Sequence, residues 1–163
     1  LRGRLALVAV QTERPPYEAY AAIAGTLVAG LGAVAALSRR SPPASALDLI
    51  ALSAATFKAS RTLSREKVAS FLRQPFVEGE AELGEDERPA GEGFQRALGE
   101  LVLCTRCVGT WSAAALASTQ MLAPRFGRAL TWTLAAGAAN DFLQASFSAL
   151  CAKANRLESP EDL

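Results

Sequence analysis

Three cysteines and one glutamate are the residues of this sequence whose types and spacing are best suited to chemistry. Glu100, Cys104, Cys107 and Trp111 follow one another at intervals of four, three and four residues. On a helix, such intervals place all four side chains on one face. Cys151 lies near the end of a later apolar segment, at what we expect to be a similar level in the fold. Two cysteines in C-x-x-C spacing are typical of zinc sites and of thiol redox sites.

Three interpretations of these cysteines stay open at the level of sequence. Zinc takes four ligands, and Cys104, Cys107 and Cys151 with Glu100 would complete such a set. A redox pair is the second interpretation, because a helix N-terminus stabilises a thiolate. In the third, the cysteines are small apolar side chains that pack one helix against another. The sequence predicts no cofactor, and zinc is the one metal for which it offers a set of ligands.

A charged residue within an apolar segment is the second candidate for a site. Asp141 interrupts a segment that otherwise carries no charge. An acidic side chain at the centre of a membrane helix costs about 2.5–3.5 kcal/mol on insertion scales, so it should face the bundle interior and meet a cation or a hydrogen-bond donor. Lys58, Arg61 and Arg106 are the candidate cations. The result would be a proton, ion or head-group site, or a structural ion pair.

These residues lie on or beside long apolar segments. The chain has 163 residues, of which 50% are hydrophobic, and residues 19–38 contain no ionisable group. At 1.5 Å per residue a helix of that length crosses the hydrocarbon core, which is about 30 Å thick. The first segment also lacks the polar face that a surface helix of a soluble bundle would need. We therefore predict one all-α membrane domain over residues 1–163, a bundle of about four transmembrane helices at about 18–38, 46–63, 100–123 and 129–152.

Between the second and third segments lies a polar loop at about 64–98, which we predict to be cytoplasmic. Its first part, 65–76, alternates charged and apolar residues and should lie at the membrane interface, ending near Pro75. Its second part, 77–93, is acidic and is expected to be a mobile, solvated loop. Metal binding by these carboxylates is the less favoured interpretation.

The distribution of Lys and Arg predicts the orientation. Most of these residues outside the apolar segments fall in the two tails and in the central loop. Positive residues accumulate on the cytoplasmic side, so both termini and the central loop should be cytoplasmic in a multi-pass protein of the bacterial cytoplasmic membrane. The absence of histidine removes His-based catalysis and His-ligated metals, and a net charge of +1 argues against a nucleic-acid partner.

Several strings, taken in order, resemble one protein family. They are FKASRTLSREK at 57–67, LRQPF at 72–76, ALGEL at 97–101, CTRCVGTW at 104–111 and NDFLQ at 140–144. This pattern is similar to the bacterial membrane-protein family known as domain of unknown function 1360, some members of which are labelled sporulation proteins. The resemblance covers about residues 47–149. It implies a small integral membrane protein with several helices, and it supplies no activity, substrate or catalytic residue.

The sequence thus favours a non-enzymatic membrane scaffold that interacts with membrane lipids and with a protein partner or a second copy of itself. The alternative is a membrane-embedded enzyme, metal- or thiol-dependent, that acts on a phosphate-bearing lipid. A small transporter or channel would depend on Asp141 alone. The candidate functional cluster comprises Arg61, Arg73, Glu100, Cys104, Cys107, Trp111 and Asp141.

Overall fold

The computed structural model describes residues 16–38, 45–79 and 87–158, and these residues are predominantly helical. The α-helices are α1 (Tyr17–Leu37), α2 (Ala46–Arg65), α3 (Ser70–Arg73), α4 (Gly93–Leu103), α5 (Thr105–Leu122) and α6 (Pro124–Glu158). Two short 3₁₀ turns, η1 (Lys67–Ala69) and η2 (Gln74–Phe76), flank α3. A small antiparallel ladder joins β1 (Val77–Glu78) to β2 (Arg88–Pro89). The all-α fold class is confirmed.

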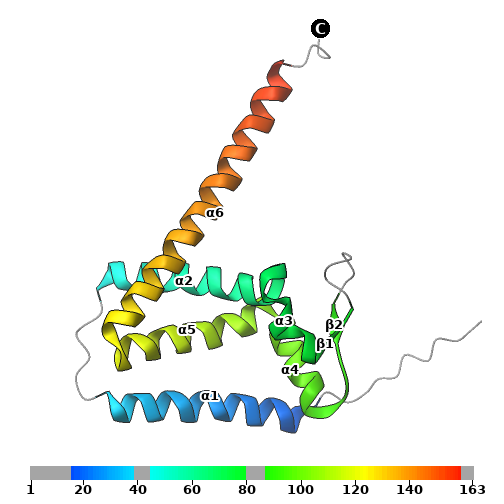
Figure 1. Cartoon of the computed structure of the whole chain (residues 1–163), viewed down its shortest axis with the longest axis vertical. Helices are drawn as coiled ribbons and strands as arrows, with labels where there is room; N and C mark the ends of the chain where they lie inside the picture. The colour runs from blue at the N-terminus through cyan, green and yellow to red at the C-terminus, as the bar shows by residue number, and fades with distance from the viewer. Residues whose placement is uncertain (1–15, 39–44, 80–86, 159–163) are drawn as a thin grey trace, which may run out of the picture.

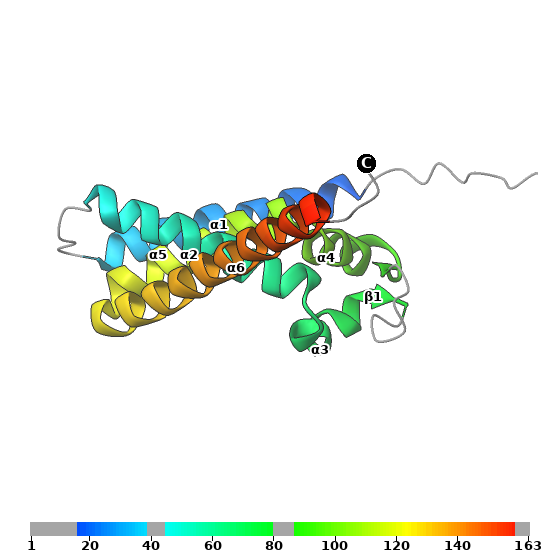
Figure 2. The same cartoon turned by 90° about the horizontal axis from the view of Figure 1, so that it is seen from above.

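Helices α1, α2 and α5 lie alongside one another, with α5 between the other two (Figure 1). The start of α1, the end of α2 and the start of α5 meet at one end of this bundle, as both views show (Figures 1 and 2). Helix α4, helix α3 and the two strands gather at that same end. The first part of α6 packs on α2 and α5, and its last turns project away from the other helices.

Local signals explain where the main helices begin. Ser45 caps α2, because its hydroxyl accepts the Asp48 N–H at 3.1 Å while the Asp48 carboxylate accepts the Ser45 N–H at 3.1 Å. Pro124 opens α6, a position where a missing N–H costs nothing. The turn between α5 and α6 depends on Gly127, since a Cβ there would overlap the backbone of Gln120.

Most buried residues of the bundle are small or carry a hydroxyl, with Val108 and Leu116 among the few larger apolar ones, whereas many large apolar side chains lie outside. Ala55 and Ala138 are among the buried residues, together with Ser64 and Thr131. These last two hydroxyls are bonded across helices: Ser64 to Thr105 at 2.8 Å, and Thr131 to the amide of Gln120 at 2.7 Å. The exposed side chains include Val28, Leu37, Leu49, Ile50, Phe142, Leu143, Phe147 and Leu150.

The four predicted membrane spans agree with the structure to different degrees. In the described part of the chain, α1 alone is long and apolar enough to cross a membrane, or two spans exist if the bent pair α4 and α5 is counted as one. Helix α2 matches the predicted span 46–63, and the longer α6 contains the predicted span 129–152, but neither helix is long and apolar enough by the same standard. Charged residues such as Lys58, Arg61 and Asp141 lower their hydropathy. A bundle of four spans is therefore not confirmed.

The third predicted span, 100–123, is wrong as a single helix. Cys104 has an extended backbone, with φ −87° and ψ 99°, and the axes of α4 and α5 differ by 86° across it. The side chain of Cys104 caps α5 by accepting the Cys107 N–H at 3.3 Å, which is why a new helix starts there. Glu100 and Trp111 consequently lie on two different helices.

The central loop also differs from its prediction. In its first part, Arg65 still belongs to α2, and residues 67–76 form three short helical turns in succession, η1, α3 and η2. The predicted mobile loop, 77–93, is ordered at both ends, where Val77 pairs with Pro89 and Glu78 with Arg88. Helix α4 packs closely on this ladder at Gly99, where a Cβ would overlap the carbonyl oxygen of Phe76. The acidic residues Glu80, Glu82, Glu85 and Asp86 lie outside the described residues.

Candidate functional site

A groove lies between α1 and the bend that joins α4 to α5. Its volume is about 520 Å³. The residues that line it are Tyr20, Ile23, Ala24, Leu27, Ala97, Glu100, Leu101, Cys104, Cys107, Thr110 and Trp111. We call it the cysteine groove. Because most of these side chains are apolar, the groove suits an apolar ligand that carries a few polar or reactive atoms.

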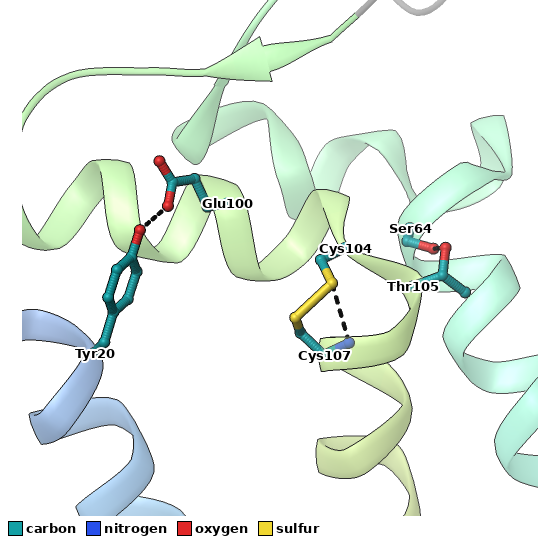
Figure 3. Close-up of a disulfide and its surroundings, with 6 residues drawn as sticks. All are labelled: Tyr20, Ser64, Glu100, Cys104, Thr105 and Cys107. Carbon is teal, nitrogen blue, oxygen red and sulfur yellow. Dashed lines mark hydrogen bonds between the residues drawn. A yellow bond between two sulfur atoms is a disulfide. The ribbon is translucent and has the colours of Figure 1, made fainter. Parts of the chain in front are cut away.

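Cys104 and Cys107 form a disulfide on the wall of the cysteine groove (Figure 3). Their Cα atoms are 5.2 Å apart, and three positions separate them in the sequence. The bond spans the first turn of α5, with Cys104 at the N-cap and Cys107 in the helix. Cys107 is exposed and Cys104 is half-buried. Of the three open interpretations, this arrangement matches a thiol pair in its oxidised state.

A tyrosine attaches α1 to α4 beside the disulfide. The Tyr20 hydroxyl donates a hydrogen bond to the carboxylate of Glu100 (Figure 3). The same carboxylate accepts a bond from Nε of Arg96 at 3.3 Å. Both Tyr20 and Glu100 line the cysteine groove. The polar contact therefore fixes the wall that α1 contributes.

The residues predicted to share one helix face do lie close together, although they come from two helices rather than one. Glu100, Cys104, Cys107 and Trp111 all line the cysteine groove, because the bend at Cys104 folds α4 and α5 around it. Cys151 does not join them, since it is a free, exposed thiol on α6. Among the residues that the structure describes, no group of three or more Cys, Asp or Glu side chains is placed to hold a metal ion.

A second cluster, the Lys58 cluster, joins α2 to α6. The ammonium of Lys58 lies 2.9 Å from a carboxylate oxygen of Glu66 and 2.9 Å from one of Asp141. This contact supplies the cation that the sequence requires for Asp141. The hydrogen bond from Lys58 lowers the pKa of Glu66, which stands at the end of α2.

Arg61 lies beside the Lys58 cluster. With Phe57 and Phe142, whose rings stack at 5.3 Å between centroids, it lines a shallow pocket of about 390 Å³. Glu66 and Asp141 line the same pocket. Arg61 itself is exposed, so its charge is accessible from outside the bundle.

The side chain of Arg73 is buried and bonded within the fold, so it is not open to a ligand. Its side chain is only 2% exposed. The guanidinium donates to the carbonyl oxygens of Leu63 at 2.8 Å and Glu66 at 3.1 Å. It also makes two bonds to the carboxylate of Glu87, at 3.0 and 3.1 Å. Arg73 thus caps the end of α2 and ties it to the residue before β2.

The predicted functional cluster therefore separates into three places. Glu100, Cys104, Cys107 and Trp111 lie in the cysteine groove, Arg61 and Asp141 lie at the Lys58 cluster, and Arg73 is buried. The sequence did not single out Tyr20 or Glu87. Each is paired with a residue far along the chain, and neither stands in a local motif.

The family model described as "Protein of unknown function (DUF1360)" matches residues 51–147. The matched region contains most of α2, the disulfide, Arg73 and the Lys58 cluster, and it begins after α1. No curated protein and no solved structure matches the chain. Since the match covers more than half of the sequence, the chain belongs to the DUF1360 family of proteins of unknown function.

Proposed function

We propose that this protein is a small integral membrane protein that acts as a scaffold for lipids and for a protein partner. The observation that carries the proposal is the distribution of its side chains. Leu37, Leu143 and Phe147 are about 70% exposed, whereas most of the buried residues are serine, threonine or alanine. So many large apolar side chains exposed at once are unusual for a soluble monomer. Small residues between helices and large apolar residues outside are the pattern expected in lipid.

The Lys58 cluster supports a membrane position for α2 and α6 although their hydropathy is low. Lys58 and Asp141 face each other at 2.9 Å, so each neutralises the charge of the other. Ionisable residues within membrane helices typically pair in this way and face neighbouring helices. Two of the charges that lower the hydropathy of these helices, those of Lys58 and Asp141, are thus paired in the tertiary structure.

The proposed topology has four crossings, by α1, by α2, by the bent pair α4 and α5, and by α6. Both termini and the central loop would then lie on the cytoplasmic side, as the Lys and Arg distribution predicts. The meeting of the start of α1, the end of α2 and the start of α5 at one end is consistent with it (Figures 1 and 2).

The same end carries the surface best suited to partners. Val68 and Phe71 are about two-thirds exposed beside the basic residues Arg65 and Lys67. Apolar and basic side chains next to one another suit the boundary between acyl chains and anionic head groups. We expect this surface to contact lipid head groups or the cytoplasmic part of a partner.

The phosphate-lipid enzyme, by contrast, gains no support from a specific observation. It needs arginines beside the cysteines. Arg73 is instead engaged by Glu87, and Arg61 lines the pocket at the Lys58 cluster rather than the cysteine groove.

Carbonate extraction of membranes followed by cysteine labelling tests the proposal. The full chain should stay in the carbonate-washed pellet. In a background with all three native cysteines changed to serine, Ala123→Cys at the α5–α6 turn should react with an impermeant maleimide on intact cells. The matched variant Glu92→Cys, exposed at the opposite end of the bundle, should react only after permeabilisation. Release by carbonate would contradict the membrane assignment, and labelling of both sites on intact cells would contradict the topology.

A further inference from the structure

The disulfide in the cysteine groove contributes little to holding the fold together. It joins residues three positions apart, within one turn at the start of α5. In the chain-entropy account, the stabilisation from a disulfide grows with the length of the loop that it closes, so a bond this local restricts the unfolded chain weakly. It also ties no second helix to α5. Its presence points to chemistry at the sulfur atoms.

The two sulfur atoms have different surroundings. Cys107 is exposed, so its sulfur is the one open to an incoming thiolate. Cys104 is the N-cap of an 18-residue helix, and its sulfur accepts the Cys107 N–H at 3.3 Å. The N-terminal amides of a helix stabilise negative charge. Cys104 is therefore the better leaving thiolate when the bond between the sulfurs opens.

The groove beside the disulfide determines which thiols can approach. Ile23, Leu27, Leu101 and Trp111 line it, and they present apolar surface next to the sulfurs. A volume of about 520 Å³ accepts a few side chains rather than a folded domain. A thiol carried on an extended apolar segment would bury that segment here, whereas a polar thiol would lose its hydration without compensation.

We propose that Cys104–Cys107 is a redox-active disulfide that oxidises a dithiol carried by an apolar peptide segment seated in the cysteine groove. One peptide thiolate attacks Sγ of Cys107, the bond between the two protein sulfurs breaks, and Cys104 leaves as a thiolate. The second peptide thiolate then attacks the peptide sulfur of the mixed disulfide and releases Cys107. Two electrons pass from the peptide to the protein. The two protons of the peptide thiols end on Cys104 and Cys107, and the peptide becomes a disulfide.

A comparison of two peptides tests the substrate class. The full chain carrying Cys151→Ser is purified in detergent, oxidised, and mixed with dicysteine peptides whose other side chains are either leucine and valine or serine and threonine. Alkylation and mass measurement follow the loss of the disulfide. We expect the apolar peptide to react at least about tenfold faster, since burial of one apolar side chain suffices for that ratio. Equal reaction of both peptides with a small aromatic disulfide is the control for their intrinsic reactivity.

Two α1 variants test whether the groove supplies this preference. Ala24 and Ala21 are both exposed on α1, and only Ala24 lines the groove. Ala24→Phe should fill the groove and bring the two rates to within about twofold, whereas Ala21→Phe should preserve the difference. Equal rates for both peptides with the unmodified groove would overturn the proposal.

Trapping of the mixed disulfide tests the order of the two sulfurs. With the oxidised peptide the exchange runs backwards, so Cys107 attacks first and Cys104 resolves. Cys104→Ser should accumulate the mixed disulfide on Cys107, and Cys107→Ser should accumulate at least about tenfold less. Equal trapping, or trapping only on Cys104, would overturn the assignment. These assays use detergent-purified protein, so their failure is distinct from a failure of the membrane proposal.

Discussion

Arg73 illustrates what a single side chain does in this protein. Its guanidinium is almost fully buried, and each of its partners is a backbone carbonyl or the carboxylate of Glu87. A buried charge is tolerated only when it is paired and hydrogen-bonded, and Arg73 meets that condition with four bonds. This member of the candidate functional cluster is thus a link between the end of α2 and the strands.

Removal of this side chain should be costly. We expect Arg73→Ala to lower the free energy of unfolding by about 3–5 kcal/mol, because Glu87, whose side chain is only 12% exposed, would lose its cation. Denaturant unfolding in detergent, followed by circular dichroism, measures the change. Arg106→Ala, at an exposed position of α5, is the matched control and should stay within about 0.5 kcal/mol of the parent. A small effect at Arg73 would contradict the described pairing.

Glu66 makes stability depend on pH in a defined direction. Its pKa in the folded chain is lowered from 4.5 by the hydrogen bond from Lys58, so its stabilising effect is present above that value and is lost as the pH falls through the lower, folded pKa. When the pH is lowered from about 6 to about 3, the melting temperature of Glu66→Gln should fall by less than that of the parent chain. Glu92→Gln, at an exposed position, should follow the parent. Identical pH profiles for all three proteins would refute the effect.

The bend at Cys104 is the feature that organises the elements. It turns what reads as one apolar helix into α4 and α5 at 86° to each other, and so creates the cysteine groove against α1. Gly99 is the second requirement, since it lets α4 approach the ladder of β1 and β2 at the carbonyl of Phe76. The small residues Ala21, Gly25, Ala29 and Ala33 of α1, at four-residue spacing, are all exposed, so the close packing that they favour is not used within the chain.

Two glycine-to-alanine substitutions should change the free energy of unfolding in opposite directions. Gly99→Ala places a methyl group against the carbonyl of Phe76 and against Pro89, and should destabilise the fold by about 1–3 kcal/mol. Gly109→Ala lies within α5, where the nearest atom would be Cβ of Ser60 at 3.9 Å, so it should stabilise by about 0.5–1 kcal/mol through helix propensity. Thermal unfolding of both variants checks the pair, and a loss of stability at Gly109 would contradict this packing.

At the scale of the whole molecule, the important feature is the reversal of the usual arrangement of side chains. Polar hydroxyls and an ion pair lie between the helices, and large apolar side chains cover the outside. In water the exposed apolar area would favour aggregation, whereas in lipid it costs nothing and the paired polar groups hold the helices together. The scaffold proposal depends on this reversal more than on any one helix.

A charged residue introduced into α1 tests whether this helix lies in lipid or in water. Val28 lies near the middle of α1 and is about 70% exposed. If α1 crosses the membrane, Val28→Arg should cost about 2.5–3.5 kcal/mol of insertion and reduce the membrane-bound fraction. Tyr17→Arg, at the end of the same helix, should have little effect because the side chain reaches the interface. An unchanged membrane-bound fraction for Val28→Arg would place α1 outside the bilayer.

Local patterns in the sequence were enough to determine several features of the protein. The positions of α1, α2 and α6, the need of Asp141 for a cation, and membership of the family all follow from apolar length, isolated charge and short motifs. These signals lie within one segment or within a short string, so they survive without knowledge of the packing.

Contacts between distant residues were decided only by the tertiary structure. Glu100 meets Tyr20 across 80 positions and Lys58 meets Asp141 across 83, and no local period encodes either pair. The bend at Cys104 was missed because 3.6-residue periodicity continues smoothly through it, while one cap bond to the sulfur ends one helix and begins another. Helical signals are local, whereas grooves and ion pairs arise where separate helices meet, and the packing of whole helices determines that meeting.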